Sequence, residues 1–256
     1  MLPFIDTAPR ARNPYVVLWL ILVNTLVFLW MESLPPRALN AALLHFALIP
    51  LRYTDPAAAV AAGLDPHDWW PLITNTFMHG GWLHLIFNMW FLWIFGPAME
   101  ARLGRFWFAV MYVGGAAAAS FLHVVTHPDS GDPALGASGA IAAVIAAYAV
   151  TYPTARVITI IPIFVIIPLF VPIPAILFAG LWFVLQVIQG SSELVSPSMA
   201  GGVAWWAHIG GFAFGAAFAL VANAAGIGLQ TATTTWSGKG ARASVPLVRS
   251  RDYERW

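Results

Sequence analysis

Residues 15–31 read YVVLWLILVNTLVFLWM, an uncharged stretch that follows Arg10, Arg12 and the pair Asn13-Pro14. A helix needs about 20 apolar residues, with a range of about 17–25, to cross the hydrocarbon core of a bilayer. The stretch therefore predicts a membrane-spanning helix, and because no small-residue cleavage site follows it, we expect an uncleaved span and not a signal peptide. Similar stretches recur, and the sequence predicts six spans: residues 15–31, 81–96, 106–126, 137–152, 174–189 and 202–222.

The composition of the whole chain is typical of a polytopic membrane protein. Of its 256 residues, 60 % are hydrophobic and 9 % are charged, and the mean hydropathy is +0.76, whereas an average soluble domain carries roughly a quarter charged residues. This excludes an ordinary cytosolic enzyme and a disordered chain. The net charge of +1 argues against a nucleic-acid partner, and the absence of cysteine excludes thiol catalysis, disulfides and Cys-ligated zinc.

The segments between the spans divide the chain further. Residues 32–78 mix acidic residues, alanines and a tryptophan pair, which is typical of a partly helical loop lying on the membrane. Residues 157–188 are uncharged but hold four prolines, so they cannot form one straight helix. We expect the part before residue 174 to lie at the membrane interface or to dip into it. The predicted organisation is an N-terminal tail (1–14), a membrane domain (15–225) and a polar, basic C-terminal tail (226–256).

The basic residues predict the orientation in the membrane. With the N-terminus inside and six crossings, ten of the twelve Lys and Arg residues fall in inside segments, leaving Arg37 and Arg52 outside. Cytoplasmic loops carry an excess of Lys and Arg, so both termini are predicted to be cytoplasmic. The short tails and the lack of a targeting segment favour a bacterial plasma membrane.

Polar side chains inside the spans predict where function lies, because such groups are expensive in hydrocarbon. The second, fourth and sixth spans run in the same direction, and His84, Ser138 and His208 each lie within the first two turns of one of them. Asn88 lies one turn below His84 on the same helix face. These four groups therefore share one level near the outer face and predict a single site.

The chemistry of these groups points to nucleophilic catalysis. Serine needs a base to become a nucleophile, and histidine is the usual one. We expect Ser138 and His208 to form a dyad, because no acidic residue within a span could complete a triad. His84, Asn88 and the backbone N–H of Ser138 could donate hydrogen bonds to an oxyanion.

Glycines flank both members of this dyad. Gly136 and Gly139 surround the serine and permit a tight entry into the helix. Gly211 and Gly215 form a GxxxG face after the histidine, and small faces let membrane helices approach closely. The fourth and sixth spans are therefore predicted to pack together.

Each of these features also has a purely structural interpretation. A serine in an Ala-rich helix usually bonds to its own backbone, and GxxxG mostly serves packing. His79, His84 and His208 could bind a metal, but the first two are five residues apart and would lie on different helix faces. We therefore expect no metal and no cofactor. His123 and His127 have no matching partner, and we expect a structural role.

Four motifs, in order, resemble those of the rhomboid intramembrane serine proteases, and the resemblance covers about residues 15–225. They are HGGWLHLIFN (79–88), EARLG (100–104), GASG (136–139) and AHIGGFAFG (207–215). The resemblance implies an all-α, six-helix bundle with a long membrane-associated first loop. It also implies a protease that cleaves transmembrane segments of protein substrates near the outer membrane face.

The resemblance assigns roles to individual residues. It implies that Ser138 is the nucleophile and His208 the general base and acid. His84 and Asn88 match the oxyanion-stabilising positions, and His79 matches a supporting one. The fifth span would be the gate for substrate entry, with Phe178, Trp182 and Phe183.

Two positions depart from the family's pattern. Pro71 follows Trp70 where many members carry Arg, which leaves the anchor of the first loop unidentified. Ala142 stands where some members place a Tyr against the catalytic histidine. Aromatic residues that could take its place are Trp205, Trp206 and Phe212.

Two other functions are compatible with parts of the sequence. A catalytically silent rhomboid-like protein would bind transmembrane helices, but such relatives typically lack the Ser or the His. A transporter or channel would favour membrane-embedded charges or broken helices in two matching halves, and the proline-rich stretch has no counterpart elsewhere in the chain.

Overall fold

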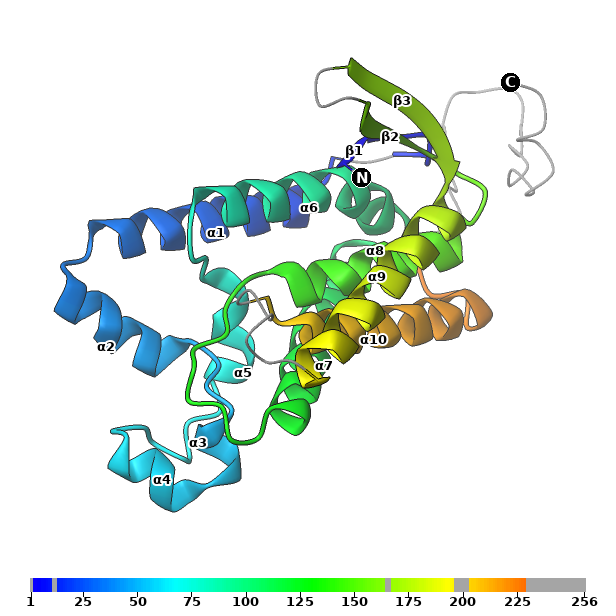
Figure 1. Cartoon of the computed structure of the whole chain (residues 1–256). Helices are drawn as coiled ribbons and strands as arrows, with labels where there is room; N and C mark the ends of the chain where they lie inside the picture. Colours follow the sequence, from blue (N-terminus) through cyan, green and yellow to red (C-terminus); the bar gives the residue numbers. More distant parts are fainter. Residues whose placement is uncertain (1, 11–12, 164–166, 196–202, 229–256) are drawn as a thin grey trace, which may run out of the picture.

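Helices make up most of the protein, and a small sheet lies at one end (Figure 1). The structure is a computed structural model that describes residues 2–10, 13–163, 167–195 and 203–228, so residues 229–256 of the predicted C-terminal tail lie outside the described residues. Within these ranges, five helices are long and apolar enough to cross a membrane: α1 (Tyr15–Ser33), α6 (Trp82–Leu103), α7 (Arg105–Thr126), α9 (Ala175–Val195) and α10 (Trp205–Ala224).

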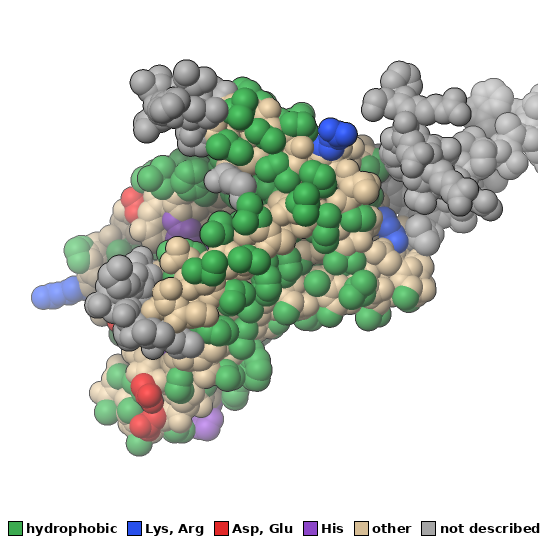
Figure 2. All heavy atoms as spheres, turned by 45° about the vertical axis from the view of Figure 1, so that its right-hand side comes forward, with side chains coloured by type: hydrophobic (Ala, Val, Ile, Leu, Met, Phe, Trp, Pro, Cys, Tyr) green, Lys and Arg blue, Asp and Glu red, His purple; other side chains and the backbone are tan. Residues whose placement is uncertain are grey.

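A sixth apolar helix, α8 (Ser138–Thr151), is shorter, with 14 residues. It is almost entirely buried among its neighbours. Each of the six predicted spans thus coincides with one helix, and the prediction of a helical, polytopic membrane fold is confirmed. Figure 2 shows hydrophobic side chains spread over much of the face it presents, with the few charged side chains towards its margins.

Helix α6 is longer than predicted, because it continues past Gly96 through the charged EARLG motif to Leu103. The buried carboxylate of Glu100 accepts hydrogen bonds from the backbone N–H groups of Val16 and Val17, at 3.0 and 2.9 Å. These belong to the first turn of α1, whose N–H groups have no partner within the helix. The acidic residue of the motif therefore caps α1 from a neighbouring helix.

The basic residue of the same motif ties α6 to the end of α10. Arg102 donates hydrogen bonds to the carbonyl oxygen of Ile227 at 2.7 Å and to Oδ1 of Asn223 at 2.9 Å. Gly104 then reverses the chain with a φ of +78°, a conformation that glycine adopts without strain. The motif thus connects the start of α1, the end of α6 and the end of α10.

The sheet consists of three antiparallel strands in the order β1-β2-β3: β1 (Leu2–Asp6), β2 (Arg156–Ile163) and β3 (Ile167–Pro174). Residues 156–163 and 167–174 pair as a hairpin, so the proline-rich stretch is not one straight helix, as predicted. The sequence did not indicate its strands, and its position at the membrane interface stays a prediction. The prolines of β3 are tolerated because this strand lies at the sheet edge. Residues 2–6, expected to be part of a tail, add the third strand.

The first loop is partly helical, as predicted. It contains α2 (Pro36–Phe46), α3 (Leu51–Thr54), α4 (Pro56–Ala61), α5 (Pro71–Thr74) and a 3₁₀ turn (Asn75–Phe77). Figure 1 shows these elements at the end of the molecule opposite the sheet. They form the approach to the start of α6.

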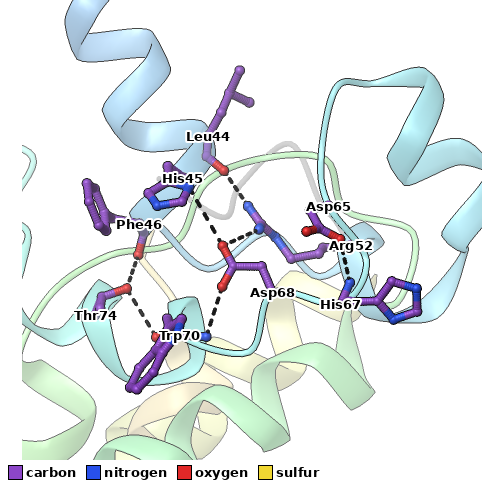
Figure 3. Close-up of polar contacts among 9 residues, drawn as sticks. All are labelled: Leu44, His45, Phe46, Arg52, Asp65, His67, Asp68, Trp70 and Thr74. Carbon is purple, nitrogen blue, oxygen red and sulfur yellow. Dashed lines mark hydrogen bonds and ion pairs between the residues drawn. The ribbon is translucent and has the colours of Figure 1, made fainter.

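A buried ion pair anchors this loop (Figure 3). Arg52, with 1 % of its surface exposed, lies 3.3 Å from Oδ2 of Asp68 and also donates to the carbonyl oxygen of Leu44. The other carboxylate oxygen of Asp68 accepts from the backbone N–H of Trp70 at 3.2 Å. Arg52 and Asp68 therefore form an anchor for the first loop, which the sequence had left unidentified.

Helices α8 and α10 touch backbone to backbone. A Cβ atom at Gly211 would overlap the carbonyl oxygen of Gly139, and one at Gly215 would overlap the carbonyl oxygen of Ala143. On its other side, a Cβ at Gly139 would overlap the side chain of Ala119 on α7. The predicted packing of the fourth span against the sixth is therefore confirmed, and the contact leaves no space for a methyl group.

Replacing Arg52 by Met should destabilise the protein. Removing one partner of a buried ion pair costs about 3–5 kcal/mol, which corresponds to a fall in the thermal unfolding midpoint of roughly 6–20 °C. The measurement is thermal unfolding of the purified protein in detergent. The matched control is Arg37→Met at an exposed position; equal midpoints for the two variants would contradict the anchoring role.

Replacing Gly215 by Ala should also destabilise the protein, because the added methyl group overlaps the backbone of α8. Overpacking of this kind costs about 1–3 kcal/mol. The control is Gly180→Ala on α9, where nothing lies within 4 Å of an added Cβ and alanine has the higher helix propensity. A Gly215→Ala midpoint at or above that of Gly180→Ala would refute the close packing.

Candidate active site

Ser138 and His208 lie within hydrogen-bonding distance of one another. Ser138 is the first residue of α8, and His208 lies one turn into α10. The distance between Nε2 of His208 and Oγ of Ser138 is 2.7 Å. The contact is possible because the glycine faces described above bring the two helices together.

The second ring nitrogen of His208 meets a residue that the sequence analysis missed. Nδ1 lies 2.8 Å from Oε1 of Gln186 on α9. Both side chains are buried, with 8 % of His208 and 6 % of Gln186 exposed. The sequence feature that could have indicated this residue is a glutamine inside an apolar span. A polar side chain in hydrocarbon is costly unless it has a polar partner.

Aromatic rings surround the imidazole of His208. The ring of Trp182 lies 5.8 Å from it, and the ring of Trp205 lies 6.0 Å from it in an edge-on contact. Of the three aromatic residues that the sequence offered, Trp205 has this contact. Trp206 instead donates to a backbone carbonyl on α9, and Phe212 stacks on Trp182.

His84 of α6 also lies near the serine. A Cβ at Gly136 would lie 2.6 Å from Nε2 of His84 and 3.7 Å from Oγ of Ser138, and Gly136 has a φ of +130°. Glycine is therefore required there both for space and for backbone conformation. Asn88, one turn along α6, is buried, and its Nδ2 has no hydrogen-bond partner among the described residues.

His79 lies behind His84, before the start of α6. It is 1 % exposed, and its ring meets that of His84 edge to face at 5.0 Å. Burial, aided by the neighbouring imidazole, lowers the pKa of His79 to about 3. The ring is therefore neutral at physiological pH and supports His84 by packing.

A cavity of about 20 Å³ lies beside Ser138, which is enough for one water molecule. Its lining includes Asn75 and Ser120, whose side chains bond to each other at 3.0 Å. The cavity adds a polar space next to the serine hydroxyl. No three His, Asp or Glu side chains in the described ranges form a group that could hold a metal ion.

His123 on α7 and His127, which directly follows this helix, have partners that the sequence did not indicate. His123 and His127 stack at 4.8 Å, and Nε2 of His127 lies 3.6 Å from Oε2 of Glu193 on α9.

Of the expected gate residues, Phe178 is buried, and its ring centre lies 5.6 Å from that of Phe95.

Comparison with known proteins identifies related sequences. The model of the Rhomboid domain matches residues 66–224. The chain is 34 % identical over 108 residues to the Bacillus subtilis protein named "Putative rhomboid protease YdcA", covering 41 % of this chain and 54 % of that one. It is 31 % identical over 145 residues to the Arabidopsis thaliana "RHOMBOID-like protein 9, chloroplastic", covering 57 % and 31 %.

A third relative extends the likeness over more of the chain. The Rattus norvegicus "Presenilin-associated rhomboid-like protein, mitochondrial" is 27 % identical over 205 residues, which are 77 % of this chain and 45 % of the relative. The chain spans about a third to a half of the length of these three relatives. Because the domain model covers more than half of the chain and includes the ordered motifs, the chain belongs to the rhomboid family.

Proposed function

We propose that this protein is an intramembrane serine endopeptidase that cleaves membrane-spanning segments of protein substrates with a Ser-His dyad. The observation that carries the proposal is the 2.7 Å contact between Nε2 of His208 and Oγ of Ser138. A serine hydroxyl is a weak nucleophile until a base within hydrogen-bond reach takes its proton. The position of this pair at the start of a buried helix, inside a membrane bundle, favours substrates that are themselves in the membrane.

The proposed reaction begins with attack of Ser138 Oγ on a peptide carbonyl. Nε2 of His208 accepts the hydroxyl proton and later gives it to the leaving amine, as in other serine proteases. An acyl-enzyme remains, which water hydrolyses with the same histidine acting as base. The cavity beside Ser138 has room for such a water molecule.

The oxyanion that forms on the carbonyl needs hydrogen-bond donors in fixed positions. The three candidate donors are the backbone N–H of Ser138, the amide Nδ2 of Asn88 and Nε2 of His84. The first belongs to the opening turn of α8, where N–H groups have no partner within the helix. The second has its donor unused in the described structure, which supports a role for it in the transition state.

The orientation in the membrane is also part of the proposal. Arg102 and Arg105 lie where α6 meets α7, and Arg156 begins β2, on the side of the molecule that carries the sheet. The positive-inside rule favours this end in the cytoplasm, so the dyad would lie near the outer face. The proposed location is a bacterial plasma membrane; of the three relatives, one is a bacterial protein, and the other two are named chloroplastic and mitochondrial. The proposed partners are transmembrane substrates and the lipid bilayer, with no nucleic acid and no cofactor.

Ser138→Ala and His208→Ala should each abolish cleavage of a tagged single-span substrate by the purified protein in liposomes. Members of such a unit act together, so loss of either removes nearly all of the rate. Thermal unfolding first checks that both variants fold. A serine-directed fluorophosphonate should label the wild type at Ser138 and leave Ser138→Ala unlabelled.

Equal cleavage by the wild type and both variants would refute the proposal. A folded wild type that neither cleaves nor takes up the label would instead favour the alternative, a silent rhomboid-like protein that binds transmembrane helices.

Asn88→Ala should lower kcat by about 10²–10³-fold with little change in KM, by analogy with the loss of one oxyanion donor in a soluble protease. The reason is that the amide would bind the oxyanion more strongly than the ground-state carbonyl. Steady-state kinetics in detergent measure both constants. Asn40→Ala, at an exposed position on α2, is the control; an unchanged kcat in Asn88→Ala would remove Asn88 from the oxyanion site.

A further inference from the structure

We propose that Gln186 is a positioning residue that holds the imidazole of His208 in the tautomer required of a general base. This inference rests on the proposed function, because it assigns to Gln186 a task in the same reaction. It starts from the 2.8 Å distance between Oε1 of Gln186 and Nδ1 of His208. Among the hydrogen bonds of the described residues, Gln186 is the one partner of Nδ1 of His208.

The orientation of the glutamine amide follows from its other contact. Nε2 of Gln186 donates to the backbone carbonyl of Trp182 at 3.1 Å. A carbonyl can only accept, so the amide nitrogen must face it, and the amide oxygen must then face the histidine. The oxygen can only accept in turn, which requires that Nδ1 of His208 carries the proton.

This fixes the state of the other ring nitrogen. A neutral imidazole has one N–H donor and one acceptor nitrogen. With the proton on Nδ1, Nε2 is free to accept the hydroxyl proton of Ser138. In the opposite tautomer Nε2 would carry a proton of its own and could not act as the base.

The amide suits a position within the membrane bundle. A carboxylate would stabilise the imidazolium more strongly, but an ionised group is expensive in hydrocarbon. The neutral amide still satisfies a buried N–H and interacts favourably with the cation that forms during the reaction. A hydrogen bond to a charged group is worth about 1.5–3 kcal/mol, so its loss should lower kcat by about 10- to 100-fold.

The direct test is the tautomer itself, read from ¹⁵N chemical shifts of the imidazole nitrogens in the full chain at alkaline pH. The chain has seven histidines, and comparison with His208→Ala identifies the signals of His208. We expect Nδ1–H in the wild type and a substantial Nε2–H population in Gln186→Leu. Nε2–H as the main form in the wild type would overturn the inference, whether or not the protein cleaves a substrate.

Kinetics of matched variants test the consequence for catalysis. Gln186→Leu should lower kcat and the rate of fluorophosphonate labelling at Ser138 by the same factor, about 10- to 100-fold, with KM little changed. Gln189→Leu is the control, because it makes the same change at an exposed position one turn along α9. Equal labelling rates in the two variants would overturn the role of Gln186.

Gln186→Glu separates positioning from packing. The carboxylate keeps an acceptor for Nδ1–H and favours the protonated imidazole. The acid limb of the pH profile of kcat/KM should therefore move to higher pH. At pH values above that limb, Gln186→Glu should be more active than Gln186→Leu. The titratable groups that act on His208 from other helices are His84 and His123, and both are unchanged in these variants. An unmoved acid limb would contradict the contact. If the wild type also fails to react with the fluorophosphonate, this result counts against the proposed function. The tautomer measurement then decides the role of Gln186.

Discussion

Gly211 and Gly215 allow the backbone of α10 to rest on that of α8, and every other feature of the site depends on this contact. A side chain at either position would overlap a carbonyl oxygen of the neighbouring helix. The resulting separation is what lets one imidazole on α10 reach one hydroxyl on α8. In a membrane, where lipid competes equally for apolar surfaces, such close packing is also a main source of helix association.

The few charged and polar groups within the bundle form hydrogen bonds between elements that are far apart in the sequence. Glu100 binds the start of α1, Arg102 binds the end of α10, and Asp6 of β1 accepts a hydrogen bond from the Tyr148 hydroxyl at 2.7 Å. Each hydrogen bond pairs a polar group that would be costly to leave unpaired where water is excluded. The framework around the dyad is thus fixed at several helix ends, while the dyad itself is fixed by Gln186 and the aromatic rings of Trp182 and Trp205.

Periodicity and motif spacing were sufficient to predict the helices and the grouping of His84, Ser138 and His208, because helices of known direction place such residues at one depth. The sequence did not reveal Gln186, since a single glutamine in an apolar run does not indicate which neighbouring helix it faces. It also did not reveal the sheet: residues 2–6 pair with a strand about 150 residues away, and an uncharged, proline-rich strand resembles a broken span. Arg52 was read as a loop charge because its partner Asp68 lies in a segment without regular periodicity.

The length of α8 has a consequence for the surrounding lipid. Fourteen helical residues rise about 21 Å, about 9 Å less than the roughly 30 Å hydrocarbon core of a typical bilayer. Tyr148, near the C-terminal end of this helix, is bound to the sheet. In the proposed orientation, with the sheet at the cytoplasmic face, the shortfall falls at the end that begins with Ser138. The depth of the hydroxyl is then set by the thickness of the host bilayer as well as by the protein. Longer acyl chains would bury it further and shorter ones would bring it nearer to bulk water.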